Sequence, residues 1–171
     1  MPVTLSTLTV PVFVRGLTIL STLLAKGAEH AAQAGMQPQD LPGARLVDDM
    51  LPLSAQVQRA SDTSKFAVQR ISGVAAPSFA DDETTFGDLQ ARISRTIAYL
   101  QSVDTSLLDA GTGKEIALNW GAAGGTFTGT TYLLTIALPN FYFHIVTAYD
   151  ILRHRGVAIG KLDYLGPFGE Q

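Results

Sequence analysis

The sequence predicts an all-α fold, an antiparallel four-helix bundle with a small β-hairpin before the last helix. Four long segments carry apolar residues at three- and four-residue spacing, which is the pattern of amphipathic helices that share a core. The stretch from residue 115 to 137 is instead rich in threonine, aromatic residues and glycine, which favours paired strands. The chain has 171 residues and no internal repeat, so one domain over residues 1–171 is predicted.

The first helix is predicted over residues 8 to 34. Leucine recurs at helical spacing from Leu17 to Leu24, and Gly35 supplies a stop. Proline lacks the backbone N–H that a helix interior needs, so the regular helix is predicted to begin near Pro11. Serine and threonine interrupt its apolar part, and no 18-residue apolar run exists. A core helix is therefore predicted, rather than a signal peptide or a membrane span.

The second helix is predicted over residues 44 to 72. Pro52 lies inside its apolar pattern, so the helix either kinks or restarts there. Asp49, Gln56 and Thr63 repeat every seven residues, which places them on one face if the helix is continuous. That face could present polar groups to the bundle interior.

The remaining elements follow from changes in the apolar period. A third helix, capped by threonine, is predicted over residues 84–108. Strands over 115–120 and 126–137, with a glycine-rich turn between them, form the hairpin. The last helix is predicted over 139–155, since proline opens it and glycine follows it. The tail, 156–171, shows no helical pattern.

Composition excludes several classes of function. The formal net charge is −3 and no run of Lys or Arg is present, which argues against nucleic-acid binding. There are no cysteines, so disulfides, thiolate metal ligands and a cysteine nucleophile are excluded. A cytoplasmic protein without membrane association is predicted.

The most informative polar residues lie on the last helix. Asn140, His144 and Thr147 share one face of an otherwise apolar segment. They could bind or polarise a small ligand, with His144 as the general base or acid. The alternative is structural: Asn140 caps a kink near Pro139, and His144 donates to a backbone carbonyl group in the core.

A metal site is the second possibility for His144, since histidine is the commonest metal ligand. His154 lies ten residues farther along, about 15 Å at about 1.5 Å per residue, so the two cannot bind one ion on a regular helix. His30 could approach His144 if the bundle places them at the same level. Asp49 or Gln56 could then complete the ligand set. A lone histidine is otherwise a hydrogen-bonded structural residue.

Three phrases carry a family resemblance: Lys26-Gly-Ala-Glu-His30-Ala, Arg45-Leu-Val-Asp-Asp49-Met50-Leu-Pro52-Leu, and Leu138-Pro-Asn-Phe-Tyr-Phe-His144 with Ala148-Tyr149-x-Ile-Leu-Arg153-His154-x-Gly156-Val. From about residue 5 to Gly166 the chain resembles a bacterial and fungal family catalogued as a domain of unknown function, affiliated with the DinB/YfiT-like helix-bundle superfamily. The resemblance implies a four-helix bundle that is frequently a homodimer.

Many members of that superfamily hold nickel or zinc through three histidines and act as thiol-dependent transferases or isomerases. Only His144 matches one of those ligands here, so the resemblance does not carry the metal chemistry over. The hypothesis we favour is a protein that binds a small molecule between helices, with ligand contacts from a set of five residues: His30, Asp49, Gln56, Asn140 and His144.

Two alternatives stay open. One is a metal-dependent thiol transferase or isomerase with a reduced ligand set that includes His144 and His30. The other is a non-enzymatic, dimeric structural or interaction module.

Overall fold

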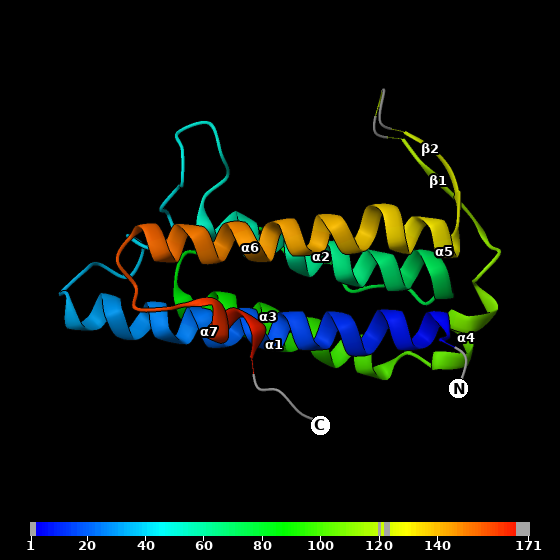
Figure 1. Ribbon diagram of the computed structural model, residues 1–171, viewed down its shortest axis with the longest axis horizontal. Coiled ribbons are helices and arrows are strands. Elements are labelled where there is room, and N and C mark those ends of the chain that lie inside the picture. Colours follow the sequence, from blue (N-terminus) through cyan, green and yellow to red (C-terminus); the bar gives the residue numbers. More distant parts are fainter. Residues whose placement is uncertain (1–2, 120, 122–123, 167–171) are drawn as a thin grey trace.

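The computed structural model describes residues 3–119, 121 and 124–166 and confirms the helix bundle with its hairpin. Four long helices form it: α1 (Leu5–Gln33), α2 (Leu53–Ser72), α3 (Phe86–Ser102) and α6 (Leu138–His154). Figure 1 shows them as two layers, with α2 and α6 in one and α1 and α3 in the other.

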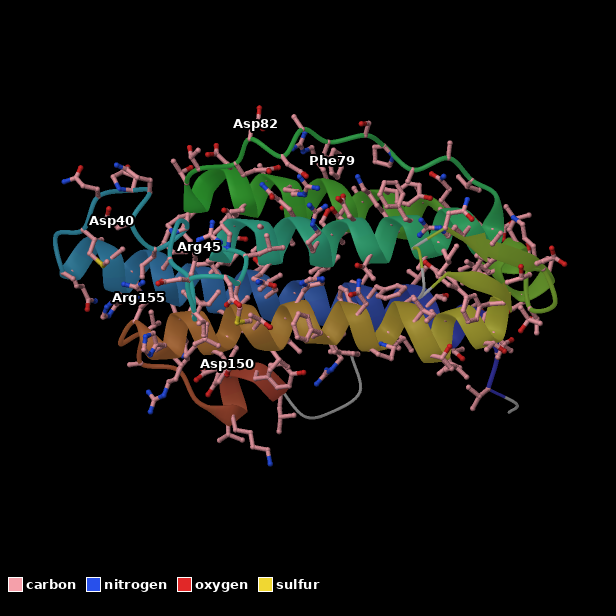
Figure 2. The ribbon with its side chains drawn as sticks, turned by 90° about the horizontal axis from the view of Figure 1, so that it is seen from above. Asp40, Arg45, Phe79, Asp82, Asp150 and Arg155 are labelled. Carbon is pink, nitrogen blue, oxygen red and sulfur yellow. The ribbon has the colours of Figure 1, made fainter. Side chains whose placement is uncertain are left out.

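The contacts fix the direction of each helix. Ser21 on α1 bonds to Gln90 on α3, and Ser6 bonds to Asp109 just beyond α3, so α1 and α3 are antiparallel. On the other layer, α2 and α6 are antiparallel, whereas α2 and α3 run the same way. Two consecutive helices can be parallel here because the connecting segment 73–85 runs back along the outer edge of the bundle beside α3 (Figure 2).

Helix α1 begins six residues before the proline at which a regular start was predicted. Thr4 caps it, since its hydroxyl accepts from the Thr7 N–H and the Thr7 side chain accepts from the Thr4 N–H. This capping box stabilises the first turn, and the helix runs through Pro11. Helix α1 is long and apolar enough to cross a membrane, but the buried core helix of a globular protein can have the same length and composition.

Helix α2 begins at Leu53, so the predicted start at residue 44 is wrong. Pro52 is the N-cap residue, in an extended conformation, and residues 44–52 form a loop. The N–H groups of Leu53 and Ser54 donate to the Ala44 and Pro42 carbonyl oxygens of the loop, at 2.9 Å each, so no helical turn precedes them. As a result Asp49 lies in the loop, where it is exposed.

Helix α3 is shorter than predicted. It ends at Ser102, and Val103 is extended. Asp104 then caps a separate short helix, α4 (Thr105–Ala110), by accepting from the Ser106 N–H. Aspartate competes with the helix for backbone donors, so this residue restarts the chain rather than continuing α3.

The hairpin consists of β1 (Glu115–Leu118) and β2 (Gly125–Thr128), which are antiparallel with Ile116 opposite Phe127. Part of the predicted glycine-rich turn lies outside the described residues. The predicted continuation of the second strand to residue 137 is wrong. Thr128 caps α5 (Gly129–Tyr132), and the chain stays helical through the π-helix η2 (Leu133–Ala137) into α6. The threonine and aromatic residues of this segment favour strands, but tertiary packing overrides that preference.

The tail also contains a helix that the sequence pattern does not predict, α7 (Lys161–Leu165). The Asp163 carboxylate accepts from the Gly160 N–H at 2.8 Å and pairs with Lys26 at 2.6 Å. These contacts hold the end of the described chain against α1.

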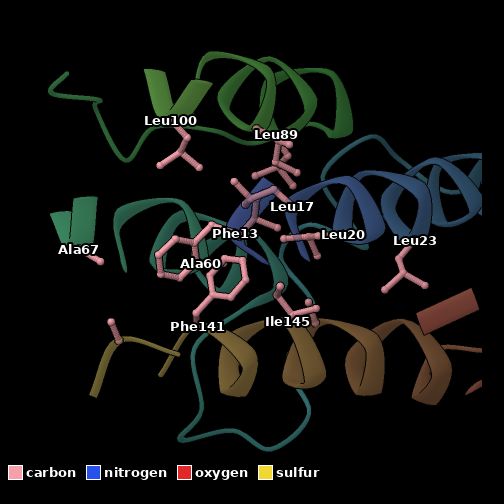
Figure 3. Packing of buried hydrophobic residues seen from close by; sticks show 14 of the residues in the cluster. Phe13, Leu17, Leu20, Leu23, Ala60, Ala67, Leu89, Leu100, Phe141 and Ile145 are labelled. Atoms are coloured by element: carbon pink, nitrogen blue, oxygen red, sulfur yellow. The ribbon is translucent and has the colours of Figure 1, made fainter. Parts of the chain in front are cut away.

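The core lies between the two layers. Phe13, Leu17 and Leu20 of α1 pack against Leu89 of α3 and Phe141 of α6 (Figure 3). The Phe13 and Phe141 rings meet edge to face, with centroids 4.9 Å apart. This packing fixes α6 against α1 and leaves an adjacent face of α6, with Asn140 and His144, toward α2.

Candidate functional site

A groove of about 250 Å³ runs along the seam between α2 and the continuous helix formed by α5, η2 and α6. Apolar and polar side chains both line it. The lining residues are Arg59, Asp62, Thr63, Phe66, Arg70, Tyr132, Ile136, Ala137 and Asn140.

The π-helix η2 forms one wall of this groove. A π-helix inserts an extra residue per turn into a helical run, and such segments occur frequently at functional sites. Ile136 and Ala137 line the groove from η2, directly before α6 begins at Leu138. No periodicity in the sequence distinguishes this segment from an ordinary strand or helix, so sequence reasoning misses it.

Asn140 and Thr63 meet across the seam. The Asn140 side-chain Nδ2 donates to the Thr63 hydroxyl oxygen at 2.8 Å. The helix is continuous through Asn140, so this residue does not cap a kink near Pro139. Because the Thr63 oxygen accepts, its own proton is left to donate, and the Asn140 carbonyl oxygen is left to accept.

His144 lies one turn beyond Asn140 and is 9% exposed. Its Nδ1 lies 2.8 Å from Oε1 of Gln56. The Gln56 Nε2 donates to the Leu51 carbonyl oxygen at 3.0 Å, so Oε1 is the atom that faces the imidazole and accepts. The proton of the neutral ring is therefore on Nδ1, and Nε2 carries the lone pair.

The charge state of His144 follows from its surroundings. Burial, with a smaller contribution from the positive charge of Arg59, lowers the pKa of His144 from 6.5 to about 4. The imidazole is thus neutral at pH 7. A neutral ring can accept a hydrogen bond through Nε2, but it is a weak general base at that pH.

The comparisons with known proteins agree with this architecture. Residues 5–165 match the family described as domain of unknown function DUF1993. This chain belongs to that family. A crystal structure of a DinB family member from Shewanella denitrificans is 36% identical, with a TM-score of 0.88 over 98% of this chain and 94% of the other. A comparison with curated proteins finds no match.

The residues of this DUF1993 domain do not fit the nickel or zinc site that the DinB resemblance implies. His30 lies against the turn at Gly156, where a glycine Cβ would be 3.7 Å from the His30 Cε1. Gly156 is twelve residues beyond His144, about 18 Å along a helix at about 1.5 Å per residue. The structure therefore separates the two histidines that were predicted to share an ion.

The remaining predicted ligands do not complete the set. Asp49 is exposed in the 44–52 loop, and Gln56 Oε1 is already bonded to His144. Within the described residues, no group of three or more His, Cys, Asp and Glu side chains could hold a metal ion. Of the five predicted ligand contacts, the structure brings Gln56, Asn140 and His144 to one seam and leaves His30 and Asp49 away from it.

A buried charge cluster lies behind the groove. Arg92 of α3 is fully buried, and its guanidinium bonds to Asp62 at 2.8 Å and to Glu83 at 3.0 Å. Lys65 is 1% exposed and pairs with Asp62 at 3.0 Å. Burial alone would lower the pKa of Arg92, but the hydrogen bond to Glu83 and the nearby carboxylates raise it, so the charge is retained.

This cluster also fastens the 73–85 segment. Lys65 donates to the Pro77 carbonyl oxygen at 2.9 Å, and Arg92 donates to the Ala80 carbonyl oxygen at 3.1 Å. The Phe79 ring, seen beside α3 in Figure 2, packs against both cations. The sequence does contain a signal for this buried cluster, because Arg92 lies at helical spacing between the apolar residues Leu89 and Leu100 of α3. An isolated charge at such a position would be costly.

Proposed function

We propose that this domain binds a small organic molecule in the groove between α2 and the α5–η2–α6 helix. The observation that carries the proposal is the set of unused hydrogen-bonding positions in the groove. Thr63 and Asn140, which offer a hydroxyl proton and a carbonyl oxygen, lie together in a lining that also includes the apolar Phe66 and Ile136. A concave apolar site with a few placed polar groups is the usual form of a ligand pocket.

His144 serves this site as a neutral contact or positioning group. His144 is not one of the lining residues of the groove, but it lies one helical turn beyond Asn140, which does line it. Gln56 holds the ring with Nε2 unprotonated. An acceptor of this kind can receive an O–H or N–H group of a ligand. The low pKa favours binding over proton transfer.

A fragment screen by protein-observed NMR tests the proposal, with fragments that cover acidic, basic and neutral compounds. We expect hits that shift the amide signals of residues around Thr63 and Asn140. The double variant Thr63→Val with Asn140→Ala should weaken those hits at least about fivefold, since each lost hydrogen bond contributes about 0.5–1.5 kcal/mol.

The matched control is Ser94→Ala, because Ser94 is an exposed residue of α3 whose hydroxyl bonds only within its own helix. This variant should bind as the unmodified protein does. The proposed function would be contradicted if no fragment binds in the groove. It would also be contradicted if the fragments bind the double variant as tightly as the unmodified protein.

A further inference from the structure

We infer that the natural occupant of the α2–α6 groove is a small organic carboxylate with a flat apolar body, whose carboxylate is held by Arg70 and Tyr132. This inference rests on the proposed function and adds the chemical class of the ligand. It follows from the donors, the charges and the volume of the groove.

Arg70 supplies the positive charge. Its Nη1 donates to the Tyr132 phenolic oxygen at 3.0 Å, and its guanidinium carbon lies 5.6 Å from the Phe66 ring centre and 5.7 Å from that of Tyr132. These contacts hold the guanidinium plane in place. In the part of the chain that the structure describes, no carboxylate pairs with Arg70. Its remaining N–H groups are free to bind a carboxylate in the two-point manner typical of arginine.

Tyr132 supplies a second donor at the same end of the groove. The residue is 2% exposed, and its phenolic oxygen accepts from Arg70, so the phenolic proton is left to donate. Burial raises the pKa of Tyr132, although Arg70 opposes this shift, so the phenol stays protonated at neutral pH. An arginine N–H and a tyrosine O–H therefore converge, which suits the two oxygens of one carboxylate.

The acidic residue of the groove does not cancel this charge. Asp62 is paired from behind by Arg92 at 2.8 Å and by Lys65 at 3.0 Å. Arg59 lies 3.9 Å from the Asp62 carboxylate and 4.0 Å from that of Asp81, so these two carboxylates offset its charge. Arg70, which has no acidic partner among the described residues, thus leaves its end of the groove positive, within a chain of net charge −3. A positive concave site attracts anions from solution.

The shape of the groove defines the rest of the ligand. A volume of about 250 Å³ lies below the roughly 300–1,000 Å³ of pockets for drug-sized molecules, so the occupant is small. The Phe66 ring offers a flat apolar face, and Ile136 adds aliphatic contact. Thr63 lies seven residues before Arg70 on α2, about 10 Å at about 1.5 Å per residue. The Thr63–Asn140 pair at that distance suits a second, neutral polar group.

Calorimetric titration with 4-hydroxybenzoate, 4-hydroxybenzamide and inorganic phosphate tests this inference. The first two compounds share a body and differ in charge. We expect the carboxylate to bind at least about tenfold more tightly than the amide, since a hydrogen bond to a charged group contributes more than one to a neutral group. Arg70→Gln should remove this difference, and Tyr132→Phe should reduce it severalfold.

Arg153→Gln is the control, because Arg153 is an exposed arginine at the opposite end of α6 and should leave the preference unchanged. Arg70→Lys keeps the positive charge and should therefore retain part of the preference for the carboxylate over the amide. Circular dichroism verifies that each variant is folded. Equal affinity for the carboxylate and the amide, or a preference that survives Arg70→Gln, would overturn the inference.

Two further outcomes also count against it. Phosphate that binds more tightly than 4-hydroxybenzoate and depends on Arg70 would indicate an inorganic or phosphorylated ligand. Binding of neither aromatic probe would also reject the carboxylate class. In both cases the fragment screen, with its acidic, basic and neutral compounds and its Thr63 and Asn140 variants, decides separately whether the groove binds a ligand at all.

Discussion

The imidazole Nδ1 of His144 lies 2.8 Å from the side-chain Oε1 of Gln56, and this one contact determines both the tautomer and the orientation of the ring. The Gln56 amide is oriented in turn by the Leu51 carbonyl oxygen, in the loop that precedes α2. A loop backbone, a helix α2 side chain and a helix α6 side chain thus form a single chain of hydrogen bonds. Such a chain holds the imidazole in one orientation at the seam where the groove lies.

Protonation of His144 should lower the stability of the fold. The pKa of His144 falls from 6.5 in an unfolded chain to about 4 in the folded state, so the unfolded state binds the proton more tightly. The stability contributed by the neutral ring is complete above about pH 6.5 and is lost progressively as the pH falls toward about 4. The loss amounts to up to roughly 3 kcal/mol.

Urea unfolding at about pH 7.5 and about pH 4.5 measures this effect, with His144→Asn as the reference. Asparagine can keep a donor toward Gln56 but does not titrate. His30 and His154 are present in both proteins, so their contributions cancel in the difference. Equal pH dependence of the two proteins would show that His144 is not the group that titrates.

The sequence predicts the helices better than it predicts the site, because apolar spacing is a local signal and side-chain pairing is not. Leu17 and Leu24 mark α1 without knowledge of their partners. The composition of residues 126–137 favours a strand, although the cap at Thr128 and the close packing of Gly129 keep the chain helical.

The site shows the same division. The seven-residue spacing puts Gln56 and Thr63 on one face of a helix, and both bond to α6. Asp49 joins them only if the helix extends backward through Pro52, which it does not. The roles of Arg70 and Tyr132 could not be predicted, since they depend on which turn of the α5–η2–α6 helix lies opposite α2.

Metal analysis of the untagged protein should give far less than one nickel or zinc ion per chain. His144 offers one imidazole nitrogen, whereas a tetrahedral site with an open position needs three protein ligands. Elemental analysis of the unmodified protein and of His144→Ala should therefore agree. A metal present at about one ion per chain and lost in the variant would contradict the prediction and favour the metal-dependent transferase.

Removal of Arg92 should destabilise the domain strongly. Arg92→Met leaves the carboxylates of Asp62 and Glu83 facing each other with one cation fewer, and breaking a buried ion pair costs about 3–5 kcal/mol. The exposed Arg95 is the control, because it also packs on the Phe79 ring but has no carboxylate partner among the described residues. Arg95→Met should cost less than about 1 kcal/mol. Thermal unfolding compares the two, and similar losses would show that the buried charges are not coupled.

The turn into α5 depends on a glycine, and two alanine substitutions can show it. A Cβ atom on Gly129 would lie 2.1 Å from the Gly111 carbonyl oxygen, which is backbone and cannot rotate away. Gly129→Ala must therefore separate the start of α5 from the turn after α4, at a cost of about 1–3 kcal/mol or more. A Cβ atom on Gly113, two residues beyond Gly111, would meet no atom within 4 Å, so Gly113→Ala should change stability by less than about 0.5 kcal/mol. Denaturant unfolding of both variants measures the difference.

Because α5 leads directly into η2, Gly129→Ala should also alter the NMR signals of Tyr132 and weaken ligand binding in the groove. Equal binding and equal NMR spectra of the Gly129→Ala and Gly113→Ala variants would show that this contact does not position the groove.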